Sequence, residues 1–233
     1  MLHTDVHLGT PLENTNAKDL VIELARNPTR AHDFNVASML WNNHFFFSGI
    51  NMNADVASAP SSEVLDEINH SFSSLDTLRE SFLTTAQAMF GPGFVWLVQV
   101  NEVNNGIVRN SFKILPTYLA GSPLSGAHYR RQSLDLNTEN PDSYTSKGLN
   151  AVGAFGSAAH TVKKDKKALG GVDVIPLLCV NTWEHVWLHD YGIRGKREYL
   201  EKWWDAIHWN KVAEQATIEP RRMPNQFMYA SNI

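Results

Sequence analysis

Apolar residues at helical spacing dominate the first ninety positions of the chain. Leu20, Val21 and Leu24 predict a helix over about 17–26, which ends before the breaker Asn27-Pro28. The segment 34–50 is apolar on almost all sides, which is typical of a buried helix. Two further stripes predict two amphipathic helices, and Ser61 or Ser62 has the residue type of an N-cap for the first of them. These stripes consist of Val64, Ile68 and Phe72, and of Leu75, Leu78 and Phe82.

The hydrophobic period changes after the Gly/Pro segment 90–93. Residues 94–100 are β-branched and aromatic and have the length of a strand. A turn at 104–106 and a second strand over roughly 107–115 follow, and 174–180 is a third, fully apolar strand. We therefore expect an α+β fold, with N-terminal helices followed by a three-stranded antiparallel meander flanked by helices.

The chain divides into regions of different composition. We expect a helical domain over 1–90, an α+β domain over 91–216 and an extended tail over 217–233. Residues 125–171 are rich in Ser, Gly, Ala, Asn and charge without a sustained period, so we interpret them as an insertion, either functional or disordered. The last predicted helix begins at Glu198 and carries Trp203, Trp204 and Ile207.

Composition excludes several classes of protein. Twenty Lys and Arg against 24 Asp and Glu leave a net charge of −4, which is wrong for a chain that coats nucleic acid over most of its surface. The single cysteine excludes a disulfide scaffold and a cysteine-rich zinc site. No apolar run is long enough to span a membrane, so no membrane partner is expected. The first sixteen residues contain no arginine and predict neither a secretory signal nor a mitochondrial presequence, so either the protein stays where it is made or the numbering starts after a removed segment.

The candidate chemistry lies in the segment Asn181-Thr-Trp-Glu-His185, directly after the third predicted strand. On a helical turn, two residues four positions apart share one face. An acidic residue followed by histidine at this spacing would be a plausible pair of metal ligands. Asn181 occupies the first place, and a neutral amide is a much poorer ligand for a divalent transition metal.

This segment resembles the C-terminal domain of iron/manganese superoxide dismutases. The resemblance extends over about 9–213, interrupted by the predicted insertion, and implies the fold of that family. It is carried by Trp183-Glu184-His185 followed by Asp190-Tyr191, Trp203 and Trp209, by Phe34-Asn35 through Trp41-Asn42 and Phe45–Phe47, by Phe90–Val98, and by Thr117–Leu124.

The resemblance implies a metal held by three histidines and an aspartate, and it also shows that most of these ligands are missing. The first histidine falls before Met1, and the second falls on Asn43. His44 stands one place late, and one residue rotates a helical side chain by about 100°. The aspartate position holds Asn181, so only His185 remains.

Other parts of the family's site are also replaced. The two positions that supply the active-site glutamine hold Met39 and Ala120, and an active-site tyrosine falls on Leu188. We therefore expect no cofactor, no metal and no catalysis, with Asn43, Asn181 and His185 as degenerate ligand positions. We expect His185 to be a buried histidine hydrogen-bonded to a neighbour, and His44 to be a core or interface histidine.

The resemblance also suggests partners. It implies that the glutamate of the Trp-Glu-His motif reaches across a two-fold interface to the neighbouring subunit's histidine, so Glu184 and His185 are candidate dimer contacts. The degraded ligands, the long insertion and the extended tail resemble the metal-free proteins of this fold in fungal mitochondrial small ribosomal subunits, which pair with one another. We therefore expect a structural protein of that subunit in the mitochondrial matrix, with mitochondrial ribosomal proteins and a related chain or a second copy as partners.

Two basic segments are candidate contacts to ribosomal RNA phosphates, although the lysine run also fits a solvated loop. The net charge indicates that protein contacts outweigh RNA contacts in area. Two alternatives remain open: a divergent or truncated superoxide dismutase, and an interaction module unrelated to ribosomes. The candidate RNA contacts are Lys163, Lys164, Lys166, Lys167, Arg221 and Arg222.

Overall fold

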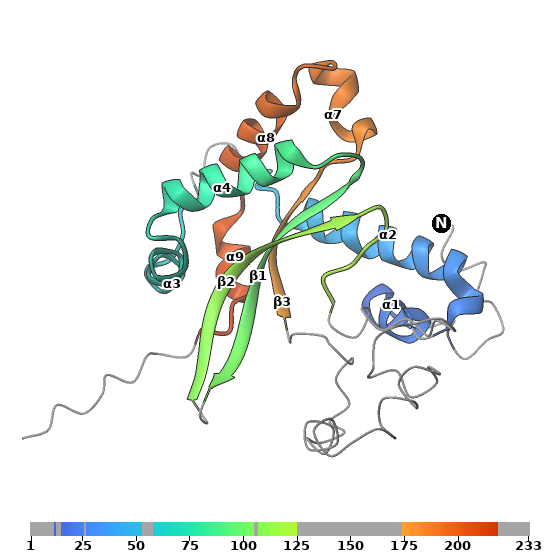
Figure 1. Cartoon of the computed structure of the whole chain (residues 1–233), viewed down its shortest axis with the longest axis horizontal. Coiled ribbons are helices and arrows are strands. Elements are labelled where there is room, and N and C mark those ends of the chain that lie inside the picture. The colour runs from blue at the N-terminus through green and yellow to red at the C-terminus, as the bar shows by residue number, and fades with distance from the viewer. Residues whose placement is uncertain are drawn as a thin grey trace, which may run out of the picture.

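A computed structural model describes the helices and the sheet of this chain (Figure 1). The predicted insertion, most of the predicted tail and all six candidate RNA-contacting residues lie outside the described residues, so those predictions stay open. The side chains of Pro28 and of residues 101–109 are also not described. The described residues are 12, 15–25, 27–52, 58–104, 107–124 and 174–218.

The N-terminal half consists of helices, as the hydrophobic spacing predicts. They are α1 (Ala17–Ala25), α2 (Ala31–Ser48), α3 (Ser62–Phe72) and α4 (Leu75–Ala88), with a short 3-10 turn (Pro28–Arg30) between the first two. In Figure 1, α1 and α2 lie on one side of the sheet, and α3 and α4 lie on the other.

The helix α2 is less buried than its apolar sequence predicts. Its inner face carries Phe34, Trp41 and Phe46, but Leu40 and Phe47 are exposed in this chain. The apolar side chains of α2 therefore form two faces of the helix, and only one face packs into the described core.

Serine side chains set the boundary between α3 and α4. Ser61 Oγ accepts a hydrogen bond from the Val64 amide, so Ser61 is the N-cap of α3. Ser73 ends α3 in the left-handed region, with φ of 71°, and Ser74 Oγ then accepts from the Thr77 amide at 3.0 Å. Two residues thus end one helix and begin the next.

The sheet has three antiparallel strands, but it is not a meander. The strands are β1 (Gly93–Asn104), β2 (Ile107–Tyr118) and β3 (Val174–Asn181), in the order β2-β1-β3. The expected meander is wrong because β3 pairs with β1 and not with β2.

The outer edge of β2 is occupied by other groups. The Phe112 amide points away from β1 and donates to Ser71 Oγ of α3 at 2.9 Å. Pro116 follows four residues later on the same edge and has no N–H to offer a further strand. These two features explain why the third strand adds on the other side of β1.

Three helices complete the C-terminal half: α7 (Glu184–Tyr191), α8 (Lys196–Asp205) and α9 (Trp209–Gln215). Contrary to expectation, Ile207 is not part of the helix that carries Trp203 and Trp204. It lies between α8 and α9 and forms an isolated β-bridge with Ile50.

Trp96 lies at the centre of the core and is fully buried. Its ring stacks on Trp41 of α2 with 5.6 Å between centroids, and its Nε1 donates to Thr117 Oγ1 on β2 at 2.9 Å. Trp203 of α8 stacks in the same way on Phe82 of α4, at 5.4 Å. Trp96, Trp203, Trp204 and Trp209 are buried in this core, whereas Trp183 is half-buried.

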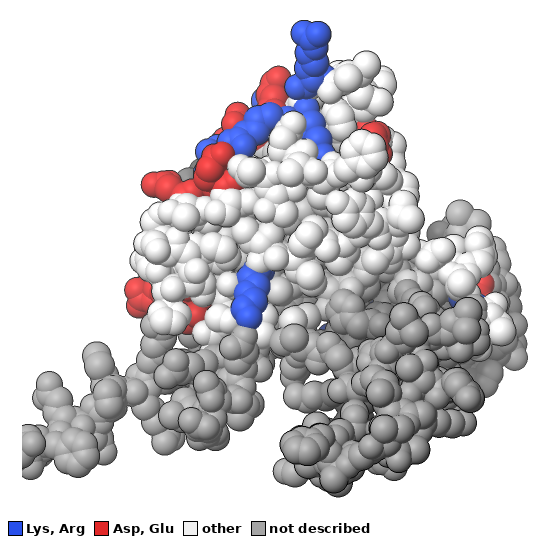
Figure 2. Space-filling model, viewed as in Figure 1, with Lys and Arg blue, Asp and Glu red and all other residues white. Residues whose placement is uncertain are grey.

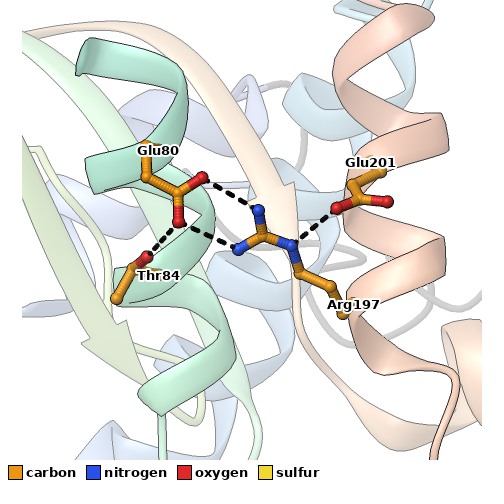
Figure 3. A network of polar contacts seen from close by, with 4 residues as sticks. All are labelled: Glu80, Thr84, Arg197 and Glu201. Atoms are coloured by element: carbon orange, nitrogen blue, oxygen red, sulfur yellow. Dashed lines mark hydrogen bonds and ion pairs between the residues drawn. The ribbon is translucent and has the colours of Figure 1, made fainter. Parts of the chain in front are cut away.

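A polar network joins α4 to α8 at the surface (Figure 3). Arg197 of α8 donates to both carboxylate oxygens of Glu80, at 2.9 and 3.5 Å, and to Glu201 at 2.8 Å. Thr84 also donates to Glu80. Figure 2 shows charged side chains gathered along this α4–α8 edge, while most of the described surface below it is uncharged. No described helix is both long and apolar enough to cross a bilayer.

Candidate functional site

Two of the three degenerate ligand positions meet in the fold. Asn43 lies on α2 and Asn181 is the last residue of β3, and the Asn181 Nδ2 group donates to Asn43 Oδ1 at 2.9 Å. Asn43 Nδ2 in turn donates to the Met39 backbone carbonyl at 2.9 Å. The two amides therefore form a polar link between helix and sheet.

Hydrogen bonds hold Asn181 through both polar atoms of its side chain and through its backbone carbonyl. Its side chain is fully buried, and its Oδ1 accepts from the Trp183 amide at 2.9 Å. Its backbone carbonyl accepts from the Tyr199 hydroxyl of α8 at 2.8 Å, and burial raises the pKa of Tyr199. Both side-chain atoms of Asn181 are thus already engaged within the protein.

The residue after Asn181 fixes the strand end against β1. The Thr182 amide and hydroxyl both donate to the Gly93 carbonyl, at 2.9 and 3.0 Å. A Cβ on Gly93 would lie 2.2 Å from the Thr117 carbonyl oxygen, so only glycine fits there. The position of the Asn181 amide is therefore determined by tight backbone contacts on two neighbouring strands.

His185 does not join the two asparagines. It lies in the first turn of α7, not on a helical turn that includes Asn181, because Asn181 still belongs to β3. His185 and Glu184 are both exposed in this chain, so the expectation of a buried His185 is wrong. Its described neighbour is the Trp183 ring, with 5.7 Å between ring centroids. Helix α7 begins only after Thr182, and its first two residues, Glu184 and His185, face solvent.

Apolar side chains are exposed on α2, which carries Asn43, and on α7, which carries His185. Leu40 and Phe47 are exposed on α2, and Leu188 is exposed on α7. His44 is exposed as well, which excludes a place in the core of this chain and leaves its expected interface role as a prediction.

One strained residue lies in the turn that packs against α2. Leu119 is 59% exposed and has a φ of 53°, a conformation that L-residues with bulky side chains rarely adopt. Its turn is fixed because Ser38 Oγ donates to the Ala120 carbonyl and Asn42 Nδ2 donates to the Gly121 carbonyl, at 2.6 and 2.9 Å. The docking of the turn onto α2 therefore holds Leu119 in its strained conformation.

Lys196 connects the beginning of α8 with the end of α4. Its Nζ donates to the Met89 and Gln87 backbone carbonyls, at 3.3 and 3.5 Å. Partial burial lowers the pKa of Lys196, and the nearby charge of Glu184 opposes this shift. A cation at this place stabilises carbonyl groups at the end of a helix.

Sequence reasoning missed a buried amide on the central strand. Gln99 is fully buried, and its side chain bonds to the backbone of Thr217, just after α9. The available signal was a single amide within the apolar run 94–100, because a buried polar side chain requires a partner.

Residues 60–126 and 153–215 match the description "Iron/manganese superoxide dismutases, C-terminal domain", and together they make up more than half of the chain. The chain belongs to the iron/manganese superoxide dismutase family. The match leaves out 127–152, which lie within the predicted insertion.

Ribosomal proteins and superoxide dismutases are both similar in sequence to this chain. Small ribosomal subunit protein mS42 of Schizosaccharomyces pombe is 31% identical over 200 residues, covering 83% of this chain and 70% of the relative. Small ribosomal subunit protein mS43 of the same organism is 25% identical, with 90% and 69% covered. The iron superoxide dismutase of Legionella pneumophila is 24% identical, with 87% and 73% covered.

The side chains present do not fit the iron or manganese ion that the family name implies. Asn181 points its N–H toward Asn43, and its oxygen already accepts from a backbone amide, so neither atom is directed at an ion. Amides are also poorer ligands for these metals than imidazole or carboxylate. Within the described ranges, no three His, Cys, Asp or Glu side chains are grouped so that they could hold a metal.

Proposed function

We propose that this chain is a structural component of the mitochondrial small ribosomal subunit, located in the matrix, with a superoxide dismutase fold that does not hold a metal. The observation that carries the proposal is the 31% identity to small ribosomal subunit protein mS42 over 83% of the chain. In this role a rigid fold scaffolds contacts to neighbouring proteins and to ribosomal RNA.

The Asn43–Asn181 bond supports a structural role over an enzymatic one. Redox catalysis by a metal requires anionic or imidazole ligands and an open coordination position. In this chain the two ligand positions satisfy each other by a 2.9 Å hydrogen bond between neutral groups. The pair stabilises the fold in the way expected of any buried, satisfied polar contact.

A divergent superoxide dismutase is the second candidate, favoured by the 24% identity to the Legionella pneumophila enzyme over 87% of this chain. The metal content of the purified protein, together with an assay of superoxide dismutation, distinguishes the two. We expect no stoichiometric iron or manganese and no activity. Stoichiometric metal with activity would establish the enzyme and exclude the proposal.

The scaffold role is tested by the particle in which the protein sediments. We expect the native protein to co-sediment with mitochondrial small ribosomal subunits in a sucrose gradient and to remain with them when the large subunit dissociates. A protein found only in the soluble fractions would instead be an interaction module unrelated to ribosomes.

The proposed partner surface is the beginning of α7. Glu184 and His185 are exposed neighbours there, and a carboxylate paired with an imidazole across a two-fold axis makes a satisfactory hydrogen bond. Exposed Leu188, one turn later, supplies apolar area beside them. The partner is a second copy or a related chain of the same fold.

This interface is tested by light scattering of the variants Glu184→Ala and His185→Ala, alone and mixed with the related chain. Each variant is expected to weaken association. Glu198→Ala, which removes another exposed carboxylate, on α8, is the matched control and should leave association unchanged. Equal effects of all three variants would place the interface elsewhere.

The proposed RNA contacts are the two basic segments outside the described residues. Each phosphate that a lysine or arginine neutralises adds a salt-dependent increment to affinity. Removing such contacts should therefore lower both the affinity for ribosomal RNA and its dependence on salt. The residues concerned are Lys163, Lys164, Lys166, Lys167, Arg221 and Arg222.

A further inference from the structure

Two glycines fix the turn between α7 and α8. Gly192 has a φ of 69° and a ψ of 176°, a conformation that essentially only glycine adopts, and its amide donates to the Leu188 carbonyl at 2.9 Å. A Cβ on Gly195 would overlap the Tyr191 carbonyl oxygen, and the Gly195 amide donates to the Gly192 carbonyl at 3.0 Å. The backbone at both ends of this turn is therefore held in one conformation.

The turn presents two exposed side chains to solvent. Only Ile193 and Arg194 lie between the two glycines, and we call this pair the α7–α8 tip. Ile193 is 86% exposed, and Arg194 is exposed as well. In Figure 1 the turn forms the top of the molecule, and Figure 2 shows Lys or Arg atoms that project at the same end. Lys202 supports the turn from α8, because its Nζ lies 4.9 Å from the centroid of the Tyr191 ring.

Arg194 has no counter-charge within the described part of the chain. It makes no hydrogen bond or ion pair with another described residue. The two acidic residues nearest to it in the sequence already have partners, since Asp190 pairs with His189 at 2.9 Å and Glu198 pairs with Lys202 at 2.8 Å. The guanidinium group of Arg194 is therefore available to a carboxylate of another molecule, which it can bind through two parallel hydrogen bonds.

The chemistry of the α7–α8 tip favours a protein over an RNA as its partner. Proteins bind RNA through cations on phosphates and through aromatic rings that stack on bases, and the aliphatic side chain of Ile193 does neither. An apolar pocket on a protein can bury that side chain, and arginine is enriched at protein interfaces. Because the backbone of the turn is already fixed, little conformational entropy is lost when the tip binds.

We propose that the α7–α8 tip docks onto a neighbouring protein of the ribosomal particle, with Ile193 in an apolar pocket and Arg194 paired with a carboxylate at the rim of that pocket. This contact is distinct from the proposed interface with a chain of the same fold. Glu184 and His185 begin α7, whereas the tip follows its other end, about 12 Å away along an eight-residue helix. The inference rests on the proposed ribosomal role and adds a second protein contact to it.

The first test measures binding of the full-length protein to mitochondrial small subunits prepared without it, by co-sedimentation over a range of protein concentrations. Ile193→Ser and Arg194→Gln are each expected to weaken binding about tenfold, as substitutions of central interface residues do. Met52→Ser changes an apolar residue that is also 86% exposed, and Lys18→Gln removes an exposed cation from α1. These two controls should leave the affinity unchanged, and thermal unfolding checks the fold of all four variants.

The second test identifies the class of partner by photo-cross-linking. The photoreactive amino acid p-benzoylphenylalanine replaces Ile193 in one protein and Met52 in another, each protein is bound to the same small subunits, and the cross-linked products are identified by mass spectrometry. We expect position 193 to cross-link to a ribosomal protein of another fold, at a segment that contains an aspartate or a glutamate. Position 52 should give no cross-link to that segment.

Three results would overturn the inference and leave the proposed function standing. The first is full affinity of both tip variants for the small subunit. The second is a cross-link from position 193 to ribosomal RNA alone, and the third is a cross-link to a second copy or to the related chain of the same fold. If the unaltered protein does not bind the small subunit at all, the proposed function fails together with the inference, so the two failures are distinguishable.

Discussion

The Asn181 side chain donates a hydrogen bond to Asn43, 138 positions away in the sequence, and this bond joins the end of β3 to the middle of α2. Both residues stand where the family resemblance places metal ligands. The same two elements that an ion would connect are therefore connected by neutral amides, and the link needs no cofactor.

This link makes a sharp prediction for Asn181→Asp. The carboxylate keeps the bond from the Trp183 amide but loses the donor to Asn43 Oδ1, and it is buried. Its charge should lower the free energy of unfolding by about 3 kcal/mol at neutral pH. Because burial raises the folded-state pKa of such a carboxyl group, the deficit should shrink as pH falls through that raised pKa.

The measurement is urea unfolding at neutral and at acidic pH. Asn210→Asp, the same chemical change at an exposed position near the N-terminus of α9, is the control and should change stability by less than about 0.5 kcal/mol. An Asn181→Asp protein as stable as the control would show that the amide pair contributes nothing to the fold.

A second prediction concerns the hydrogen bond of the central tryptophan. Thr117→Val removes the acceptor of Trp96 Nε1 without changing the size of the side chain, and it leaves a buried N–H without a partner. We expect a loss of about 1–2 kcal/mol in thermal or denaturant unfolding. Thr84→Val at an exposed position of α4 should cost clearly less; equal costs would contradict the role of the Trp96 bond.

A third prediction is a gain in stability. Leu119 has a φ of 53°, and asparagine tolerates this region far better than leucine does. Leu119→Asn should therefore stabilise the isolated protein by about 0.5–1 kcal/mol in denaturant unfolding. Ile193→Asn exchanges another exposed apolar residue outside the left-handed region and should give no such gain. A gain of similar size there would refute the strain argument.

The fourth prediction uses the α4–α8 network of Figure 3. The hydrogen bond from Arg197, followed by that from Thr84, lowers the pKa of Glu80. A group with a lowered folded-state pKa stabilises the fold above its unfolded pKa, and this contribution is lost as pH falls through the folded pKa. The destabilisation caused by Arg197→Met should thus be largest at neutral pH and should fade below about pH 4.3.

Urea midpoints of the unaltered protein and of Arg197→Met, taken at neutral and acidic pH, give this difference. Glu80→Gln provides the control, because without the carboxylate the effect of Arg197→Met should depend much less on pH. A difference that persists undiminished at low pH would mean that Arg197 acts through packing and not through its charge.

Helices and strands could be predicted from local patterns because each buries one periodic face. In α3 the local signals are the N-cap residue Ser61 and the apolar stripe that includes Val64 and Ile68, and the structure confirms both. Strand order could not be predicted in this way. It depends on the Ser71–Phe112 bond and on the absent N–H of Pro116, which act at an edge that forms only after folding.

The candidate site was predictable in identity but not in geometry. Asn43 and Asn181 could be found by alignment to the family's ligands, yet their mutual bond depends on the packing of α2 against β3. The exposure of His185 was missed because Asn181 ends a strand and the helix begins only at Glu184. The bond between Gln99 and Thr217 joins residues 118 positions apart, and no local pattern specifies such a contact.

The strand order described above also constrains the segment between β2 and β3. Both strands run antiparallel to β1, so they run parallel to each other on its two flanks. Tyr118 lies at the Gly93 end of β1, whereas Val174 lies beside Val100. The connection must therefore return along the whole sheet as a crossover, which takes about a dozen residues or more.

The chain between Tyr118 and Val174 thus has a minimum length that topology sets, and a short hairpin turn cannot replace it. Above that minimum, each doubling of a flexible loop costs only about 0.6 kcal/mol in closure entropy. Length can therefore be added here with no change in the register of any strand. This crossover is a place where the protein can gain new contacts while its sheet stays the same.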